Sequence, residues 1–191
     1  MTDSQTHWDN RYQKNPELNP FSDFLPATEK YLPSSGSCVD IAGGNGRNAL
    51  WYAEKGYSTS LIDISPIALN QATEASHNLG VEIECIHWDL ENNSLPPNRQ
   101  WDIALITLFL DRNLLQKVPN FLNDSGILLL AHPTKQNLER HEHPSSNFLL
   151  EPAEIFKLGE SFELAHSMEV IHVDEAWRDS GRHEAWLVCQ K

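Results

Sequence analysis

Three glycines that lie close together, Gly43, Gly44 and Gly46, follow a short apolar stretch. Residues 44–49 satisfy the pattern G-x-G-x-x-G/A, which holds nucleotide-like ligands between a strand and a helix. Glycine is needed there because a backbone that bends sharply and approaches a ligand closely leaves no room for a Cβ. The segment therefore predicts a ligand-binding turn that opens a helix.

Two carboxylates near this turn indicate which ligand it holds. Asp63 lies 19 residues after Gly44, where it could accept hydrogen bonds from ribose hydroxyls, although a helix N-cap is the alternative. Asp40 ends the apolar stretch, where its charge would repel a pyrophosphate and attract an ammonium or sulfonium cation. Asp40 therefore favours S-adenosylmethionine over a dinucleotide.

Polar residues also follow the later apolar stretches. Asp89 could accept a hydrogen bond from an adenine amino group and Leu90 could offer its backbone N–H, or Asp89 caps a loop. His132 could be a general base or a structural histidine. Arg112 and Arg182 could orient an anionic acceptor, or they form surface ion pairs.

The chain resembles class I S-adenosylmethionine-dependent methyltransferases, in particular the bacterial branch related to tellurite-resistance and thiopurine methyltransferases. Residues 8–12 (WDNRY) are similar to the N-terminal lid of that branch, and residues 40–50 and 63–65 to its cofactor segments. Ala42 stands where many members have a glycine. The resemblance implies these cofactor-binding residues: Arg11, Asp40, Ala42, Gly43, Gly44, Gly46, Asn48, Asp63, Ile64, Asp89, Leu90 and Thr107.

Short apolar stretches alternate with helical segments along the chain, which predicts a parallel sheet covered by helices on both faces. The predicted strands are 38–42, 59–63, 82–87, 102–108, 127–131, 164–173 and 183–189. The predicted helices are 4–14, 22–32, 47–55, 66–79, 114–122 and 152–158. The predicted fold class is α/β, with a doubly wound, Rossmann-like, seven-stranded sheet that is mostly parallel and ends in an antiparallel hairpin.

The polar, proline-bounded segment 133–144 follows the fifth predicted strand, after a turn at 123–126. Loops at the carboxyl ends of strands line the ligand crevice of an open α/β sheet, so this one is expected to shape the acceptor pocket, a solvated connector being the alternative. His141 and His143 have no third ligand at a readable spacing, so no metal is predicted. The three cysteines are expected to be buried thiols.

Length and composition narrow the possible functions. With 191 residues the chain is expected to be one domain, with residues 1–33 as a helical lid and residues 34–191 as the cofactor-binding core. A net charge of −13 would repel a phosphate backbone, so nucleic acid is not expected as a partner. No apolar stretch approaches the ~18 residues of a membrane span, so the protein is expected to be cytoplasmic, away from membranes.

The predicted activity is methyl transfer from S-adenosylmethionine to a small, soft or anionic acceptor. Residues 107–110 lack the Asn/Asp-Pro-Pro-aromatic signature of DNA amino-methylating enzymes, which argues against base-amine chemistry. If the acceptor is a thiol, no general base is required, because a thiolate is already nucleophilic. A non-catalytic S-adenosylmethionine-binding protein and an NAD-binding reductase are the alternatives.

Overall fold

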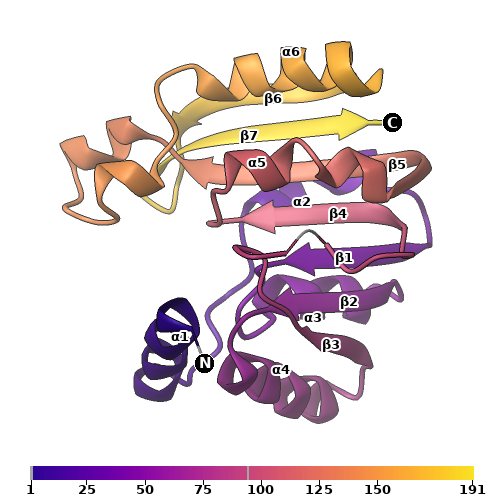
Figure 1. The fold of residues 1–191 in the computed structure, drawn as a ribbon, viewed down its shortest axis with the longest axis vertical. Helices are drawn as coiled ribbons and strands as arrows, with labels where there is room; N and C mark the ends of the chain where they lie inside the picture. The colour runs from indigo at the N-terminus through magenta and orange to yellow at the C-terminus, as the bar shows by residue number, and fades with distance from the viewer. Residues whose placement is uncertain (1, 94) are drawn as a thin grey trace.

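The computed structural model describes residues 2–93 and 95–191, which are built around one seven-stranded sheet (Figure 1). The strand order is β3-β2-β1-β4-β5-β7-β6, with β7 antiparallel to both of its neighbours and every other pair parallel. The strands are β1 Ser37–Ile41, β2 Ser58–Asp63, β3 Ile83–His87, β4 Trp101–Thr107, β5 Leu122–Pro133, β6 Glu169–Trp177 and β7 His183–Gln190. The predicted fold class, including the C-terminal hairpin, is confirmed.

Six α-helices and four short 3-10 helices occur among the described residues, three of them ahead of β1 and the others between strands. The α-helices are α1 Asp3–Lys14, α2 Phe24–Thr28, α3 Arg47–Glu54, α4 Pro66–Leu79, α5 Arg112–Leu115 and α6 Glu154–His166. The 3-10 helices are η1 Glu29–Tyr31, η2 Val118–Phe121, η3 Lys135–Glu139 and η4 Ser146–Phe148. No helix among the described residues is long and apolar enough to cross a membrane.

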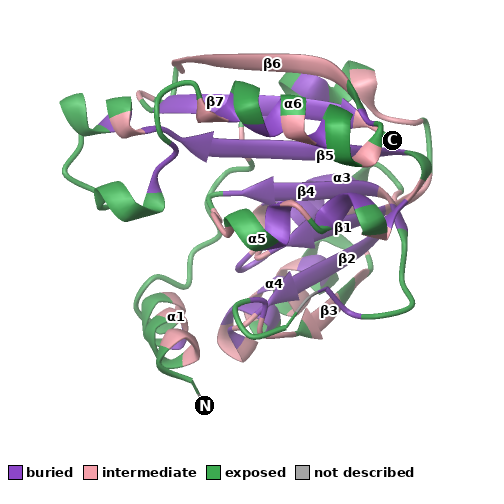
Figure 2. Ribbon diagram, turned by 45° about the horizontal axis from the view of Figure 1, so that its top comes forward, coloured by how far each residue is buried: buried purple, intermediate pink, exposed green. Residues whose placement is uncertain are grey.

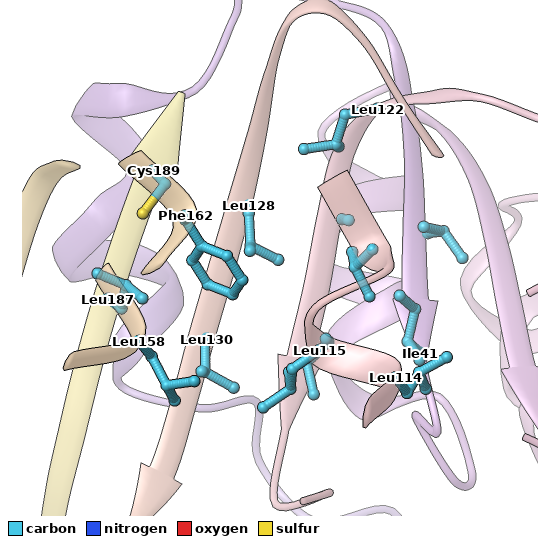
Figure 3. Packing of buried hydrophobic residues seen from close by; sticks show 14 of the residues in the cluster. Ile41, Leu114, Leu115, Leu122, Leu128, Leu130, Leu158, Phe162, Leu187 and Cys189 are labelled. Atoms are coloured by element: carbon cyan, nitrogen blue, oxygen red, sulfur yellow. The ribbon is translucent and has the colours of Figure 1, made fainter. Parts of the chain in front are cut away.

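The core forms on both faces of the sheet because successive strand residues point to opposite sides. Leu128 and Leu130 of β5 pack on the side of α5 and α6, with Leu158 and Phe162 of α6 (Figure 3). Ile127, Leu129 and Ala131 pack on the other side, with side chains of α2 and α3. The sheet interior is buried, whereas the edge strand β6 is half-exposed (Figure 2).

The boundary between the last predicted helix and the sixth predicted strand was wrong. Helix α6 extends to His166, so the predicted strand start at 164 lies in the helix and β6 begins at Glu169. Ile155, Leu158 and Phe162 follow helical spacing and bury one face of α6. Leu164 lies off that face and is 89 % exposed. Its apolar side chain therefore suggested the start of a buried strand where there is none.

Two predicted helices are shorter than expected, and each is broken by local chemistry. The segment 114–122 divides into α5 and η2 because Pro119 has no N–H for an α-helical bond. The segment 22–32 divides into α2 and η1; Thr28 Oγ1 donates to Phe24 O, and Leu32 is extended ahead of a proline. The predicted turn at 123–126 is an irregularity within β5, where the register with β4 shifts.

Candidate functional site

The predicted ligand-binding turn lies at the carboxyl end of β1 and opens α3. Gly46 is the left-handed residue before the helix, with φ 82°, and Gly44 is also left-handed, with φ 61°. A Cβ on Gly44 would collide with the Tyr12 hydroxyl, and one on Gly43 would collide with the Asp40 carboxylate. Close contacts therefore require glycine at all three positions, and the left-handed backbone adds a second reason at Gly44 and Gly46.

Ala42 is also left-handed, with φ 55°, although it carries a Cβ. This conformation costs an L-residue roughly 1–2 kcal/mol. Position 42 thus keeps the backbone shape that a glycine would adopt without strain. A second strained residue, Leu108 with φ 59°, directly follows β4 at the same edge of the sheet.

Asp40 is fully buried beneath the turn. Its Oδ2 accepts a hydrogen bond from Ala49 N at 3.1 Å, which ties β1 to α3. Its Oδ1 has no hydrogen-bond partner in the part of the chain that the structure describes. Burial raises the pKa of Asp40 to about 7, opposed by the charge of Arg47. A buried carboxylate oxygen without a donor is suited to a cation above the turn.

Asp63, at the end of β2, holds the turn in place. Its Oδ2 accepts from Gly44 N at 2.8 Å and its Oδ1 from Ser65 N at 2.9 Å. Burial raises the pKa of Asp63, whereas these two N–H groups oppose the rise. Ser65, rather than Asp63, is the N-cap of α4, because its hydroxyl accepts from Ala68 N. Each Asp63 oxygen keeps a lone pair for a further donor.

Helix α1 lies beyond the carboxyl ends of the strands and packs against α4 (Figure 1). Ser65 Oγ donates to Asp9 Oδ1 at 2.6 Å, and Gln71 Nε2 donates to Tyr12 O at 3.0 Å. Arg11 is exposed, with its guanidinium 5.4 Å from the centre of the Trp8 ring. Helix α1, which belongs to the predicted lid, thus lies beside the glycine turn and is held to α4 by polar contacts.

The contacts of Asp9, Ser65 and Gln71 between α1 and α4 were not predicted from the sequence. Their signal was weak: Asp9 and Tyr12 are three residues apart and so share one helix face, but their partners lie more than 50 residues away. Only the fold shows which surface that face meets.

A hydrogen-bonded chain connects the lid segment to the end of β4. Ser22 N donates to Asn48 Oδ1 at 3.0 Å, and Asn48 Nδ2 donates to Thr107 Oγ1 at 2.9 Å. Because a backbone N–H can only donate, the orientation of the Asn48 amide is fixed. The Thr107 hydroxyl hydrogen must then point to another group. Asn48 and Thr107, both buried, thus present a hydroxyl donor at the carboxyl edge.

The predicted adenine-binding residues lie at the end of β3. Asp89 Oδ1 accepts from Glu91 N at 3.0 Å and Asn92 N at 3.2 Å. The Asn92 side chain, which donates to Asp89 Oδ2 at 2.8 Å, lowers the pKa of Asp89, and the two backbone bonds add to this effect. This is the loop-capping arrangement that was the alternative for Asp89. The side chain of Leu90 is buried in the core. His87 Nε2 donates a hydrogen bond to the backbone oxygen of Ile64 at 2.9 Å.

His132, in β5, is buried against the segment that precedes α6. Its Nε2 lies 2.8 Å from Phe148 O, and because a carbonyl can only accept, Nε2 carries the hydrogen. Its Nδ1 has no partner among residues 2–93 and 95–191. Burial lowers the pKa of His132 to about 4, so the ring is neutral at pH 7. The contact to Phe148 matches the structural interpretation of this residue.

Arg112 and Arg182 lie in different surroundings. Arg112 Nε and Nη2 donate to the two carboxylate oxygens of Glu154 at 2.5 and 2.8 Å, and the pair raises the pKa of Arg112. The ion-pair alternative is thus observed for Arg112. Arg182 is exposed in the turn between β6 and β7. Burial lowers the pKa of Arg47, and the charge of Arg182 contributes to the same shift, so the two arginines lie near each other.

A pocket of about 510 Å³ opens beside Arg112. It is bounded by the start of α5, by parts of the segment 135–149 and by the region around the first turn of α6. Segment 133–144, which was predicted to shape an acceptor pocket, contributes Lys135 to this one. No group of three potential metal ligands occurs among the described residues.

The part of the chain that carries the glycine turn matches a known protein family. Residues 38–126, from β1 to the irregular part of β5, match a family model described as a methyltransferase domain. The tRNA 5-carboxymethoxyuridine methyltransferase of Escherichia coli K12 is 28% identical over 120 residues, covering 58% of this chain and 45% of that protein. The chain therefore spans less than half the length of the curated relatives it matches.

Solved structures show the same fold. TehB from Haemophilus influenzae superposes with a TM-score of 0.70 at 17% identity, covering 96% of this chain and 67% of that one. A SAM-dependent methyltransferase from Methanosarcina mazei superposes with a TM-score of 0.67 at 19% identity, covering 91% and 99%. Residues 38–126 thus match a methyltransferase domain, and the fold of the described residues is that of solved S-adenosylmethionine-dependent methyltransferases. Two further solved methyltransferases of this fold contain bound S-adenosylhomocysteine, so S-adenosylmethionine is the cofactor that the fold indicates.

Proposed function

We propose that the protein transfers the methyl group of S-adenosylmethionine to a small, soft or anionic acceptor at the carboxyl edge of the sheet. The acceptor's lone pair forms the bond to the methyl carbon, while the carbon–sulfur bond breaks and its electron pair stays on sulfur. The cofactor supplies only the methyl group. The protein's own task is to align the two molecules and exclude water.

The contacts at the carboxyl edge support a specific division of roles. The unpaired Asp40 Oδ1 suits the cationic end of the cofactor, and the free lone pairs of Asp63 suit the ribose hydroxyls. Asp89 and the backbone of Leu90 stay as the proposed adenine contacts at the end of β3. Residues 1–33 act as the lid in this proposal, and residues 34–191 as the core.

The state of His132 is the observation that carries the acceptor assignment. A buried imidazole whose pKa is lowered to about 4 is a weak base at neutral pH. An acceptor that must lose a proton during transfer would therefore find little help from His132. A thiolate or an oxyanion reacts without such help. In this proposal His132 orders the segment around Phe148 rather than removing a proton.

A thermal-shift comparison of S-adenosylmethionine, S-adenosylhomocysteine, NAD and NADP tests the cofactor half of the proposal. A ligand that binds only the folded protein raises its melting temperature. At 100 times its Kd, such a ligand adds about 2.7 kcal/mol to the free energy of unfolding. Both adenosyl compounds are expected to stabilise the protein. Stabilisation by NAD alone would instead support a reductase.

The release of S-adenosylhomocysteine in the presence of candidate thiols and carboxylic acids tests the acceptor half. Compounds that are anionic at the assay pH should support turnover. If the pH dependence of the rate shows a transition near pH 6.5, the His132→Gln variant should show the same transition. If compounds of both kinds bind but none is methylated, the non-catalytic alternative is favoured.

A second candidate acceptor is nucleic acid, which the name of the matched Escherichia coli methyltransferase favours. The substrate in that name bears a carboxymethoxy group, so it too offers an oxyanion. The net charge of −13 opposes binding of a phosphate backbone. Incubation with bulk tRNA and radiolabelled cofactor distinguishes the two, since incorporation into RNA is expected only for this second candidate.

We place either activity in the cytoplasm. The three cysteines are free thiols, which suits a reducing compartment.

A further inference from the structure

The Arg112–Glu154 ion pair leaves three of the five guanidinium N–H groups of Arg112 unused. Glu154 accepts along the side edge of Arg112, from Nε and Nη2. Guanidinium carries five N–H groups, so both hydrogens of Nη1 and one of Nη2 remain. These three have no acceptor in the described part of the chain. They form a second, end-on edge that can grip an oxyanion through two parallel hydrogen bonds.

Glu154 holds that second edge in a fixed direction. Its Oε2 accepts from Glu151 N at 2.8 Å in addition to its bond with Arg112, and its side chain is only 16 % exposed. Arg112 itself is 46 % exposed, on the wall of the 510 Å³ pocket. An arginine held at one edge loses less conformational entropy when a ligand binds the other edge.

The charges around the pocket indicate the class of ligand. Three cations, Arg112, Lys135 and Lys157, line the wall together with two carboxylates, Glu151 and Glu154, so one positive charge remains unbalanced. Lys135 pairs with Glu151, whereas Lys157 has no ion-pair partner in residues 2–93 and 95–191. One net positive charge suits a single negative charge better than the dianion of a phosphate monoester.

The pocket lies close to the proposed reaction edge. Arg112 follows the end of β4 by five residues, and the charges of Arg112 and Glu154 both reach His132 in β5. We propose that this pocket binds a monoanionic carboxylate, held end-on by Arg112, and that the carboxylate belongs to the methyl acceptor. Only the second part rests on the proposed methyl transfer. Glu154 is a positioning residue in this arrangement.

The chain contains a matched control for this geometry. Arg99 and Glu84 also form a two-bond ion pair, beside a second pocket of about 400 Å³. There, however, the bonds run from Nη1 and Nη2, at 2.5 and 2.7 Å. The end-on edge of Arg99 is already occupied by Glu84. The pocket beside Arg99 is therefore expected not to bind the ligands that the pocket beside Arg112 binds.

Titration of the isotopically labelled protein, followed by nuclear magnetic resonance, tests the proposal without any cofactor. The probe is phenoxyacetate, a monoanion, and 2-phenoxyethanol is its neutral counterpart. Phenoxyacetate is expected to shift the backbone signals of Ser146, Asn147 and Lys157, while those of Asn98 and Asn120 stay in place. The Arg112 Nε–H signal should keep its hydrogen-bonded position, because Glu154 retains the side edge.

Arg112→Lys keeps the charge and removes the fork, so it is expected to weaken phenoxyacetate binding by about fivefold or more. Arg99→Lys should leave the affinity unchanged. The inference is overturned if phenoxyethanol binds equally well, if Arg112→Lys binds like the wild type, or if both pockets respond alike. Tighter binding of inorganic phosphate than of phenoxyacetate overturns the choice of carboxylate. None of these outcomes depends on whether the protein transfers methyl groups. The proposal of a carboxylate pocket and the proposal of methyl transfer can therefore fail independently.

Discussion

Asp63 connects the backbone of the site before any ligand binds. Its two oxygens hold Gly44 N and Ser65 N, so the glycine turn and the start of α4 share one carboxylate. The spacing from Gly44 predicted a ligand-binding aspartate but not this structural role. Both roles are compatible, because a carboxylate has about four acceptor positions for two backbone donors.

Asp63→Ala is expected to weaken S-adenosylmethionine binding by about 1 to 3 kcal/mol, since the ribose hydroxyls lose a charged acceptor. Isothermal titration calorimetry measures this. Asp102→Ala is the matched control, because Asp102 also accepts from a backbone N–H, that of Ser37, at the opposite end of β1. Equal affinity losses in the two variants would mean that Asp63 acts through stability alone.

Ala42→Gly should leave the stability unchanged or raise it by up to about 1 kcal/mol. Relief of the left-handed strain is partly offset by the greater freedom of glycine in the unfolded chain. Ala75→Gly, in the regular helix α4, should instead cost about 1 kcal/mol. Urea unfolding of both variants gives the comparison, and a similar loss in both would show that position 42 is not strained.

Helix α1 is the element whose position the sequence specified least. Its helical character and its resemblance to a lid were readable from residues 8–12, but its docking surface depends on pairs such as Asp9 with Ser65, 56 residues apart. The same limit applies to α6, whose Glu154 meets Arg112 across 42 residues. Pairings of this kind follow from tertiary structure and leave no periodic pattern in the chain.

Asp9→Ala removes the buried bond that docks α1. We expect the dissociation rate of S-adenosylhomocysteine to rise about tenfold, equivalent to about 1.4 kcal/mol, and trypsin to cleave faster after Arg11 and Lys14. Stopped-flow displacement and timed proteolysis are the measurements. Ser4→Ala, which removes an exposed contact between α1 and Glu91, serves as the control. An unchanged release rate in Asp9→Ala would contradict a lid role for α1.

For the molecule as a whole, the mostly parallel sheet covered by helices and the antiparallel hairpin at its end were predicted from the sequence, whereas the strand order came from the fold. Buried parallel strands such as 102–108 form continuous apolar runs, which are the strongest signal in this chain. The boundaries near Pro119 and Leu164 were not predictable, because a local break and an exposed leucine mislead pattern reading. The glycine turn was found from sequence, whereas the pocket beside Arg112 required the fold.

Global stability should depend on pH through Asp40. Its folded-state pKa of about 7 lies above the ordinary value of 3.8, so between these values the folded protein binds a proton that the unfolded chain lacks. This contribution is present at low pH and is lost as the pH rises through 7. His132, with a lowered pKa, contributes the opposite slope below pH 6.5, so the comparison requires a variant.

Asp40→Asn removes the Asp40 titration and keeps an acceptor for Ala49 N. Its stability relative to the wild type is expected to rise by roughly 2 to 3 kcal/mol between pH 5 and pH 8. Chemical denaturation of both proteins across that range measures the difference. A difference that does not vary with pH would show that Asp40 stays charged throughout.

The direction of β7 gives this fold a division of labour along the chain. Because β7 alone runs against the other six strands, the turn at 178–182 returns to the edge where β4 and β5 end. Residues 38–107 carry most of the proposed cofactor contacts at that edge, and residues 108–182 supply the elements on its other side, including the pocket beside Arg112. Under the proposed function, the reversed strand therefore places acceptor recognition and methyl-donor binding on separate stretches of the chain.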